Sequence, residues 1–174
     1  GHSVTIVSSD RDFLQVLDDN VEVYSPIKKK IYKKRDVAEE LGMIPENYLI
    51  VKSLLGDNSD NLTGVKGLGI KTILKEFPGI INDPNFNLES IFSICEEKLK
   101  TKKIFARIVH EWDKVETNYE LMNLLEPRLS DQEILYILNK IKQPTTSLQV
   151  QPFLRMLEID KIEALNKNVE GWLE

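Results

Sequence analysis

The sequence contains a single cysteine, two histidines and no apolar run approaching the roughly 18–20 residues of a membrane-spanning helix. One cysteine excludes an internal disulfide and a cysteine-based zinc site, and it is typical of a reducing compartment. Cys95 itself follows an apolar helical pattern, which predicts a buried core thiol. His2 is terminal, His110 lies in an amphipathic pattern, and no Gly-x-Ser-x-Gly, P-loop or His-Glu-x-x-His motif is present. We therefore expect neither membrane contact nor histidine-based catalysis.

The remaining composition is that of an ordinary soluble globular protein, with 41% apolar and 29% charged residues among 174. The formal net charge of −5 argues against indiscriminate binding to nucleic acid. Basic residues are nevertheless clustered in two stretches, 28–35 and 98–107. A solvated surface is the simpler explanation of such stretches, and local contact with nucleic acid is the alternative.

The apolar pattern changes character along the chain. Val4 to Val7 is an apolar and β-branched run, which predicts a strand buried on both faces of a parallel sheet. Two more strand-like stretches flank Pro26, and we place both at the edge of the sheet. Beyond residue 32 we expect helices only, over residues 35–41, 46–54, 70–77, 88–99, 103–115, 119–125, 131–141, 148–157 and 160–168. The predicted fold is thus an α/β edge with few strands near the N-terminus, followed by a mainly helical region.

Two pairs of aspartates are the first candidates for chemistry. Asp10 and Asp12 follow the first predicted strand, and α/β proteins place ligands at the carboxyl ends of such strands. Asp57 and Asp60 lie in a turn flanked by glycines. Four carboxylates around one cleft would repel one another unless divalent cations neutralised them, and oxygen ligands suit Mg²⁺ or Mn²⁺. The alternative for the first pair is that one aspartate caps the following helix, a role that we favour more for Asp12 than for Asp10.

Three glycines, Gly64, Gly67 and Gly69, follow the second acidic pair directly. Their spacing before a helix predicted from Ile70 is the pattern of a helix–hairpin–helix, which we place at residues 55–77. Glycine permits close approach of the backbone, so a DNA phosphate can rest against the amides of Gly67, Gly69 and Lys71. Sequence-independent attraction would come from three lysines: Lys66, Lys71 and Lys75. The alternative is a helix C-cap followed by an ordinary tight turn.

The stretch from Gly56 to Thr72, GDNSDNLTGVKGLGIKT, closely resembles the helix–two-turn–helix signature of the 5′-nuclease superfamily. Members include the 5′→3′ exonuclease domains of bacterial DNA polymerase I, phage 5′-exonucleases and ribonuclease H, and flap endonucleases. The stretch from Ser8 to Gln15 is similar to the family's second acidic motif, and its distance to Asp57 also fits. Residues 118–124 are similar to a segment that follows the helical DNA-binding region, and the second half looks most like that of a phage member.

The resemblance implies a set of catalytic metal ligands for two Mg²⁺ or Mn²⁺ ions: Asp10, Asp12, Asp57 and Asp60. It also implies that the hairpin binds duplex or branched DNA, such as a 5′ flap or an RNA–DNA primer. The residues that contact DNA would be Gly64, Lys66, Gly67, Gly69, Lys71, Thr72 and Lys75. A monovalent cation such as K⁺ would be held by the backbone carbonyls of Val65, Gly67 and Ile70.

Three family features are absent from this chain: the strand that ends in a first catalytic aspartate, the helical arch, and the acidic cluster that precedes the strand at Val4. The resemblance therefore covers the family's C-terminal half, and we expect the missing N-terminal half of the nuclease to be a partner. Residues 1–54 would be the C-terminal part of an α/β catalytic core, and residues 55–174 a helical DNA-binding region. The family's setting implies replication or repair in the cytoplasm of a bacterium or a phage-infected host cell.

Three hypotheses follow from these patterns. The leading one is a divalent-metal-dependent, structure-specific 5′-nuclease, either an exonuclease or a flap endonuclease, with little activity in this part alone. The second is a non-catalytic helix–hairpin–helix module that binds duplex DNA and keeps the aspartates as relics. The third is a helical protein-interaction domain, which only the amphipathic helices after Leu88 support. Dependence on a divalent metal discriminates between the first two.

Overall fold

The structure is a computed structural model that describes residues 2–126, 128–144 and 149–162. The chain divides into two compact units, residues 1–127 and residues 128–174, and each is described by itself. The division predicted at residues 54 and 55 concerns function rather than compactness, and it stays a prediction.

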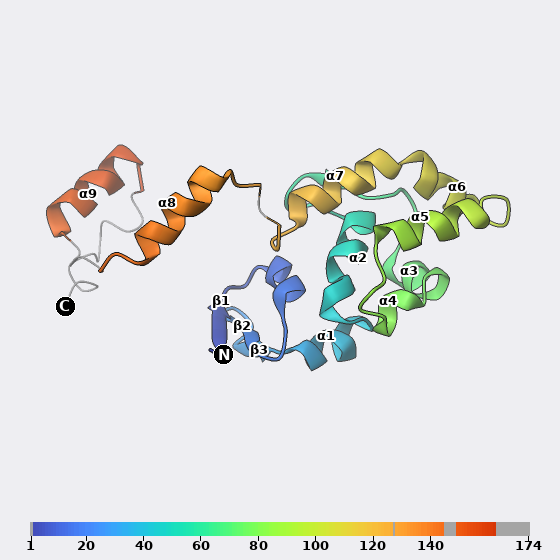
Figure 1. Cartoon of the computed structure of the whole chain (residues 1–174), viewed down its shortest axis with the longest axis horizontal. Helices are drawn as coiled ribbons and strands as arrows, with labels where there is room; N and C mark the ends of the chain where they lie inside the picture. The colour runs from blue at the N-terminus through green and yellow to red at the C-terminus, as the bar shows by residue number, and fades with distance from the viewer. Residues whose placement is uncertain (1, 127, 145–148, 163–174) are drawn as a thin grey trace. The chain divides into compact units, whose positions relative to one another are not determined.

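A three-stranded sheet opens the first unit (Figure 1). Strand β1 (Val4–Val7) pairs in parallel with β2 (Val21–Ser25), and β3 (Lys30–Tyr32) pairs with β2 in the antiparallel direction. The first predicted strand and its parallel pairing are therefore confirmed. Its predicted burial on both faces is wrong, because β1 pairs with one strand within the described residues and Val7 is 66% exposed. The third strand is shorter than predicted, since residues 26–29 form a turn.

Two short 3₁₀ helices and two α-helices accompany the strands. The first 3₁₀ helix, η1 (Arg11–Val16), connects β1 to β2, and α1 (Lys34–Leu41) ends at Gly42 as predicted. The second 3₁₀ helix, η2 (Pro45–Asn47), opens α2 (Tyr48–Leu55). Every residue of α2 from Tyr48 to Leu54 is buried, so this helix is surrounded by the rest of the unit.

The remainder of the first unit is helical except for one small strand pair. That pair, β4 (Gly56–Asp57) and β5 (Leu62–Thr63), contradicts the prediction that no strand lies beyond residue 32. The helices are α3 (Ile70–Glu76), α4 (Gly79–Asn82), α5 (Leu88–Glu97), α6 (Lys103–His110) and α7 (Trp112–Met122). The helix predicted over 103–115 is thus two helices that meet at Glu111. Of the helix predicted at 119–125, residues 119–122 are the end of α7, and residues 123–125 are not helical.

Helix α2 lies at the centre of the first unit, with the sheet on one side and α3 to α6 on the other, while α7 crosses beside it (Figure 1). One hydrophobic core joins these layers and includes Leu54, Ile73, Phe77 and Phe105. Cys95 belongs to the same core and is fully buried, as predicted, and burial raises the pKa of its thiol to about 12. The core therefore fixes the strands, α2 and α3 relative to one another.

The second unit contains α8 (Asp131–Ile141) and α9 (Val150–Ile159). A capping box opens α8, because Ser130 accepts from the Glu133 N–H and Glu133 accepts from the Ser130 N–H. The helix predicted over 160–168 lies largely outside the described residues. Within the ranges that the structure describes, no helix is long and apolar enough to cross a membrane. The predicted succession of few strands followed by many helices is confirmed.

Candidate metal and nucleic-acid site

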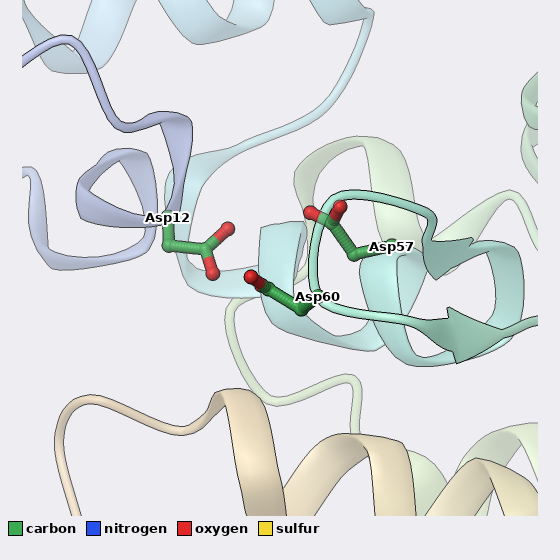
Figure 2. Close-up of side chains that lie close together, drawn as sticks. All are labelled: Asp12, Asp57 and Asp60. Atoms are coloured by element: carbon green, nitrogen blue, oxygen red, sulfur yellow. The ribbon is translucent and has the colours of Figure 1, made fainter.

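Three aspartates from two separate segments converge in the first unit. Asp12 lies on η1, Asp57 on β4 and Asp60 in the loop that joins β4 to β5. One carboxylate oxygen of each lies within 4.8 Å of the others. Figure 2 shows the Asp12 and Asp60 carboxylates pointing toward one another, with Asp57 beside them. We call Asp12, Asp57 and Asp60 the acidic cluster.

The fourth predicted ligand, Asp10, lies outside this cluster. Its carboxylate accepts a hydrogen bond from the Asp12 backbone N–H at 2.9 Å and thereby caps the N-terminus of η1. The expectation that favoured Asp12 for the capping role is therefore wrong. The reason is local geometry: a capping side chain accepts from an N–H about two residues further on, and only Asp10 stands at that distance before the first turn.

A lysine that the sequence analysis did not select binds two members of the cluster. Lys52, on α2, donates hydrogen bonds from Nζ to the carboxylates of Asp12 and Asp57, the second at 2.6 Å. Burial acts to lower the pKa of Lys52, but these hydrogen bonds outweigh burial and raise it above its ordinary value. One feature of the sequence could have indicated this role for Lys52. It is the single charged residue in the apolar run of α2, where a lysine is buried only when it has partners.

Asp57 is the most strongly held carboxylate of the cluster. Its Oδ2 accepts from Lys52, and its Oδ1 accepts from the Ser59 backbone N–H at 2.8 Å and from the Ser59 hydroxyl. The hydrogen bond from Lys52, followed by that from the Ser59 hydroxyl, lowers the pKa of Asp57 to about 2. The carboxylate is therefore ionised at any physiological pH.

Two buried polar side chains fix the segments that carry the cluster. Gln15, on η1, donates to the Met122 carbonyl at 2.9 Å and accepts from the Leu124 N–H at 3.1 Å. Asn118, on α7, donates to the carbonyls of Ser53 and Thr63, each at 3.0 Å. Helix α7 and the residues that follow it thus fix the positions of η1, the end of α2 and β5. These positions set the distance between Asp12 and the other two aspartates.

The chain passes from the cluster into residues 65–69, which we call the glycine turn. The Val65 N–H donates to the Leu54 carbonyl at 2.9 Å, which ties the turn to the end of α2. Gly64 packs directly on that end, since a Cβ there would lie 2.0 Å from the Leu55 carbonyl oxygen. Gly67 has a φ of 77°, which favours glycine.

The predicted phosphate-binding residues surround this turn with unequal exposure. The side chains of three lysines are exposed on one stretch: Lys66, Lys71 and Lys75. Gly67 and Gly69 are exposed as well, whereas Thr72 is half-buried. An open cavity of about 260 Å³, lined by Lys52, Asp57 and Ile70 among others, connects the cluster with the start of α3.

The donor set of the acidic cluster fits a hard divalent cation. Carboxylate oxygens are the ligands that Mg²⁺ and Mn²⁺ prefer, and Asp57 stays ionised to low pH. Asp60 is exposed and has the freest access to a cation from solvent. Lys52 partly neutralises the cluster, so a bound cation would compete with its ammonium group for Asp12 and Asp57.

Sequence relatives of this chain are 5′-3′ exonucleases. No protein-family model matches the sequence. The 5′-3′ exonuclease of Aquifex aeolicus is 31% identical over 171 residues, which are 93% of this chain and 54% of that protein. The 5′-3′ exonuclease of Buchnera aphidicola is 39% identical over 107 residues, 60% of this chain and 37% of that protein. The chain thus spans about half the length, or less, of these relatives.

A solved structure shares the fold. The flap endonuclease of bacteriophage T5, in a pseudo-enzyme–product complex with DNA and metal ions, superposes with a TM-score of 0.61 at 23% identity. The match covers 81% of this chain and 54% of that one. The chain is therefore similar in sequence to 5′-3′ exonucleases, and the T5 flap endonuclease shares its fold.

Proposed function

We propose that this chain is the metal- and DNA-binding part of a 5′-nuclease that depends on divalent metal ions. Its substrate would be a phosphodiester bond in DNA or in an RNA–DNA primer, near a 5′ end or flap, during replication or repair. The observation that carries the proposal is the acidic cluster, whose loop leads directly into the glycine turn. The names of the relatives and the DNA and metal ions bound to the T5 protein support it.

Asp12, Asp57 and Asp60 would hold Mg²⁺ or Mn²⁺, and Asp10 lies two residues from Asp12 as a fourth carboxylate. When bound, such ions activate water and stabilise the leaving oxygen in phosphodiester hydrolysis. The chain's own residues prepare the site: hydrogen bonds keep Asp57 ionised, and the Lys52 ammonium screens the repulsion between Asp12 and Asp57. A catalytic role for all four aspartates is part of this proposal.

The end of α2, the glycine turn and α3 would form the helix–hairpin–helix predicted at residues 55–77. Backbone amides of the turn would approach a phosphate, while the exposed lysines attract the backbone of duplex DNA without regard to sequence. The proposed contacts are Gly64, Lys66, Gly67, Gly69, Lys71, Thr72 and Lys75. The carbonyls of Val65, Gly67 and Ile70 would hold K⁺, and a loss of DNA affinity when K⁺ is exchanged for Li⁺ would support that cation site.

The proposed partner within the nuclease is its other half. The outer edge of β1 carries exposed Val4 and Val7 and has no neighbouring strand within the described residues, so it can accept another strand. We propose that further carboxylates come from that half, and that the setting is the cytoplasm of a bacterium or of a phage-infected host cell. The chain alone should then cleave flap DNA poorly. Robust Mg²⁺-dependent cleavage by the chain alone, abolished by Asp10→Asn, would contradict the need for the other half.

Binding of Mn²⁺ tests the metal site directly. We expect the purified chain to bind Mn²⁺ in a calorimetric titration, and Asp60→Asn to weaken that binding by at least about tenfold because it removes a charged ligand. Asp19→Asn is the matched control, since Asp19 is exposed and outside the cluster. Equal Mn²⁺ binding by both variants would reject the metal site.

Binding of a labelled 5′-flap duplex, followed by fluorescence anisotropy without divalent metal, tests the DNA surface. The double variant Lys66→Glu with Lys71→Glu should lose most of the affinity, because charge reversal repels the phosphates. The matched control is Lys28→Glu with Lys29→Glu, which reverses the same charge on the turn between β2 and β3. An equal loss in both double variants would mean that net charge, rather than the glycine turn, determines binding.

One observation favours the second candidate, a DNA-binding module without catalysis. Lys52 neutralises part of the acidic cluster without any metal ion, as a structural ion pair would. The two candidates differ in the metal experiment. Flap-DNA affinity that is intact in a chain that binds no Mn²⁺ would favour the module.

A further inference from the structure

The backbone of the glycine turn is held by residues about forty positions further along the chain. The Leu68 N–H donates to the Val65 carbonyl at 3.1 Å, and Gly67 has a φ of 77°. Gly67, the third residue of this turn, has a positive φ and Lys66, the second, does not, which is the combination found in a type II turn. Types I and II differ in the direction of the central peptide, here the one between Lys66 and Gly67. The orientation of that peptide decides which backbone groups the turn presents to solvent.

Arg107, on α6, binds this central peptide. Its Nη1 donates to the Lys66 carbonyl at 2.5 Å, and the same atom lies 2.9 Å from the position that a Cβ would take on Gly67. Helix α6 is anchored on both sides of Arg107, since Phe105 and Ile108 are fully buried and the Phe105 ring packs edge-on against Phe77. The guanidinium therefore comes from a rigid element.

The Glu111 carboxylate faces the Lys66 backbone N–H, as its electrostatic interactions indicate. Glu111 lies where α6 meets α7, its N–H donates to the Arg107 carbonyl at 2.9 Å, and its carboxylate accepts from Lys114. The hydrogen bond from Lys114, and to a smaller extent one from the Lys66 backbone N–H, lowers the pKa of Glu111. Both backbone polar groups of Lys66 thus have a charged partner at the junction of α6 and α7, while its side chain is exposed.

Because a trans peptide is planar, the hydrogen bond from Arg107 to the Lys66 carbonyl also fixes the direction of the Gly67 N–H. The N–H of Gly67 points opposite to the C=O of Lys66 because both belong to one peptide plane. Since Arg107 holds the carbonyl toward α6, the Gly67 N–H points away from α6, and Gly67 is exposed. We propose that Arg107 and Glu111 are positioning residues that hold the Lys66 backbone, so that the Gly67 amide is presented to a phosphate of duplex DNA. This inference rests on the proposed DNA-binding function of the glycine turn.

Substitution of Glu111 distinguishes an effect of charge alone from an effect of positioning, because the two predict opposite changes in DNA affinity. If charge alone mattered, removing a carboxylate beside the turn would strengthen DNA binding. If Glu111 positions Lys66, Glu111→Ala weakens binding of the 5′-flap duplex by about fivefold to tenfold, because a hydrogen bond to a charged group is lost. Glu111→Gln keeps an oxygen that can accept from the Lys66 N–H, so it should bind DNA at least as well as the unaltered chain.

Arg107 variants extend the test. Arg107→Ala should weaken DNA binding by about tenfold. Arg107→Lys keeps the charge but not the planar guanidinium, so its DNA affinity should lie between those of the unaltered chain and of Arg107→Ala. The control for the loss of one exposed positive charge is Arg155→Ala, on α9. Hydrogen exchange of the Gly67 amide, measured by NMR without DNA, reports the turn itself and should change in the two alanine variants but not in Arg155→Ala.

The outcomes of these experiments distinguish failure of the positioning role from failure of the proposed DNA-binding function. If Lys66→Glu with Lys71→Glu leaves DNA affinity unchanged, the proposed function fails. If that double variant loses affinity while Glu111→Ala binds as tightly as Glu111→Gln, or more tightly, only the positioning role is overturned. A Glu111→Ala variant that fails to fold leaves Arg107→Lys to decide: DNA affinity and Gly67 exchange equal to those of the unaltered chain would overturn the proposal.

Discussion

The acidic cluster and the glycine turn follow one another in the chain but are held in opposite ways. In the cluster the side chains are bound, since Lys52 contacts two carboxylates and Ser59 contacts Asp57 as well. In the turn the backbone is bound, by Leu54 and Arg107, while the lysine side chains remain exposed. The cluster is therefore sensitive to substitution of single carboxylates and to pH, whereas the turn is sensitive to backbone geometry and to salt.

The largest effect is expected where the two regions join. A Cβ on Gly64 would overlap the backbone of Leu55 and Gly56, with the nearest atom 2.0 Å away. Gly64→Ala should therefore lower the free energy of unfolding by about 3 kcal/mol or more, measured by urea denaturation. The control is Gly69→Ala, where a Cβ would meet nothing within 4 Å and the loss should stay within about 1 kcal/mol. Equal losses would show that the close approach at Gly64 does not hold the junction.

Lys52→Met tests the bound side chains of the cluster. The ammonium is mostly buried between two carboxylates, so its removal should cost about 2 kcal/mol of unfolding free energy at neutral pH. The same change should strengthen Mn²⁺ binding by about tenfold, because no cation then competes for Asp12 and Asp57.

The control for this prediction is Lys102→Met, which removes one partner of the more exposed ion pair between Lys102 and Glu76. Its cost should stay below about 1 kcal/mol, and Mn²⁺ binding should not change. Weaker Mn²⁺ binding in Lys52→Met would contradict the idea of competition, and would mean that Lys52 is needed to hold the carboxylates in place.

Local sequence patterns predicted the strand at Val4–Val7 and the helices α1 and α8, because each depends on neighbours within one turn or one strand. Burial of β1 could not be predicted, since it depends on how many strands pair with it. The break at Glu111 was hidden because apolar residues continue at helical spacing from α6 into α7.

The residues of the candidate site were likewise predicted only in part. Asp12, Asp57 and Asp60 were predicted from their residue type and from a family resemblance, and the structure brings them together. Lys52 was missed because its partners lie on η1 and β4, so its role exists only in the folded chain. Arg107 was missed for the same reason, since it meets the glycine turn across a long sequence separation.

Acid should weaken the cluster within a defined pH window. The pKa of Asp57 is lowered from 3.8 to about 2, so the stabilisation from its ionised form is present above pH 3.8 and is lost as pH falls toward 2. Asp57→Asn should cost about 1 kcal/mol at neutral pH, after allowance for solvent screening, and this difference should vanish near pH 2. Urea denaturation of both forms across this range measures it. A difference that stays constant with pH would mean that the cost comes from packing rather than from charge.

The smallest effect is expected from a single exposed lysine of the turn. Lys71→Ala removes one exposed charge that makes no fixed contact among the described residues, so flap-DNA affinity should fall by only about threefold at moderate salt. The slope of log Kd against log salt should decrease by about one, because one counterion fewer is released from the DNA. Arg155→Ala should leave both quantities unchanged. If Lys71→Ala instead lowers affinity equally at every salt concentration, its side chain makes a fixed contact, and the contrast between bound carboxylates and free lysines does not hold.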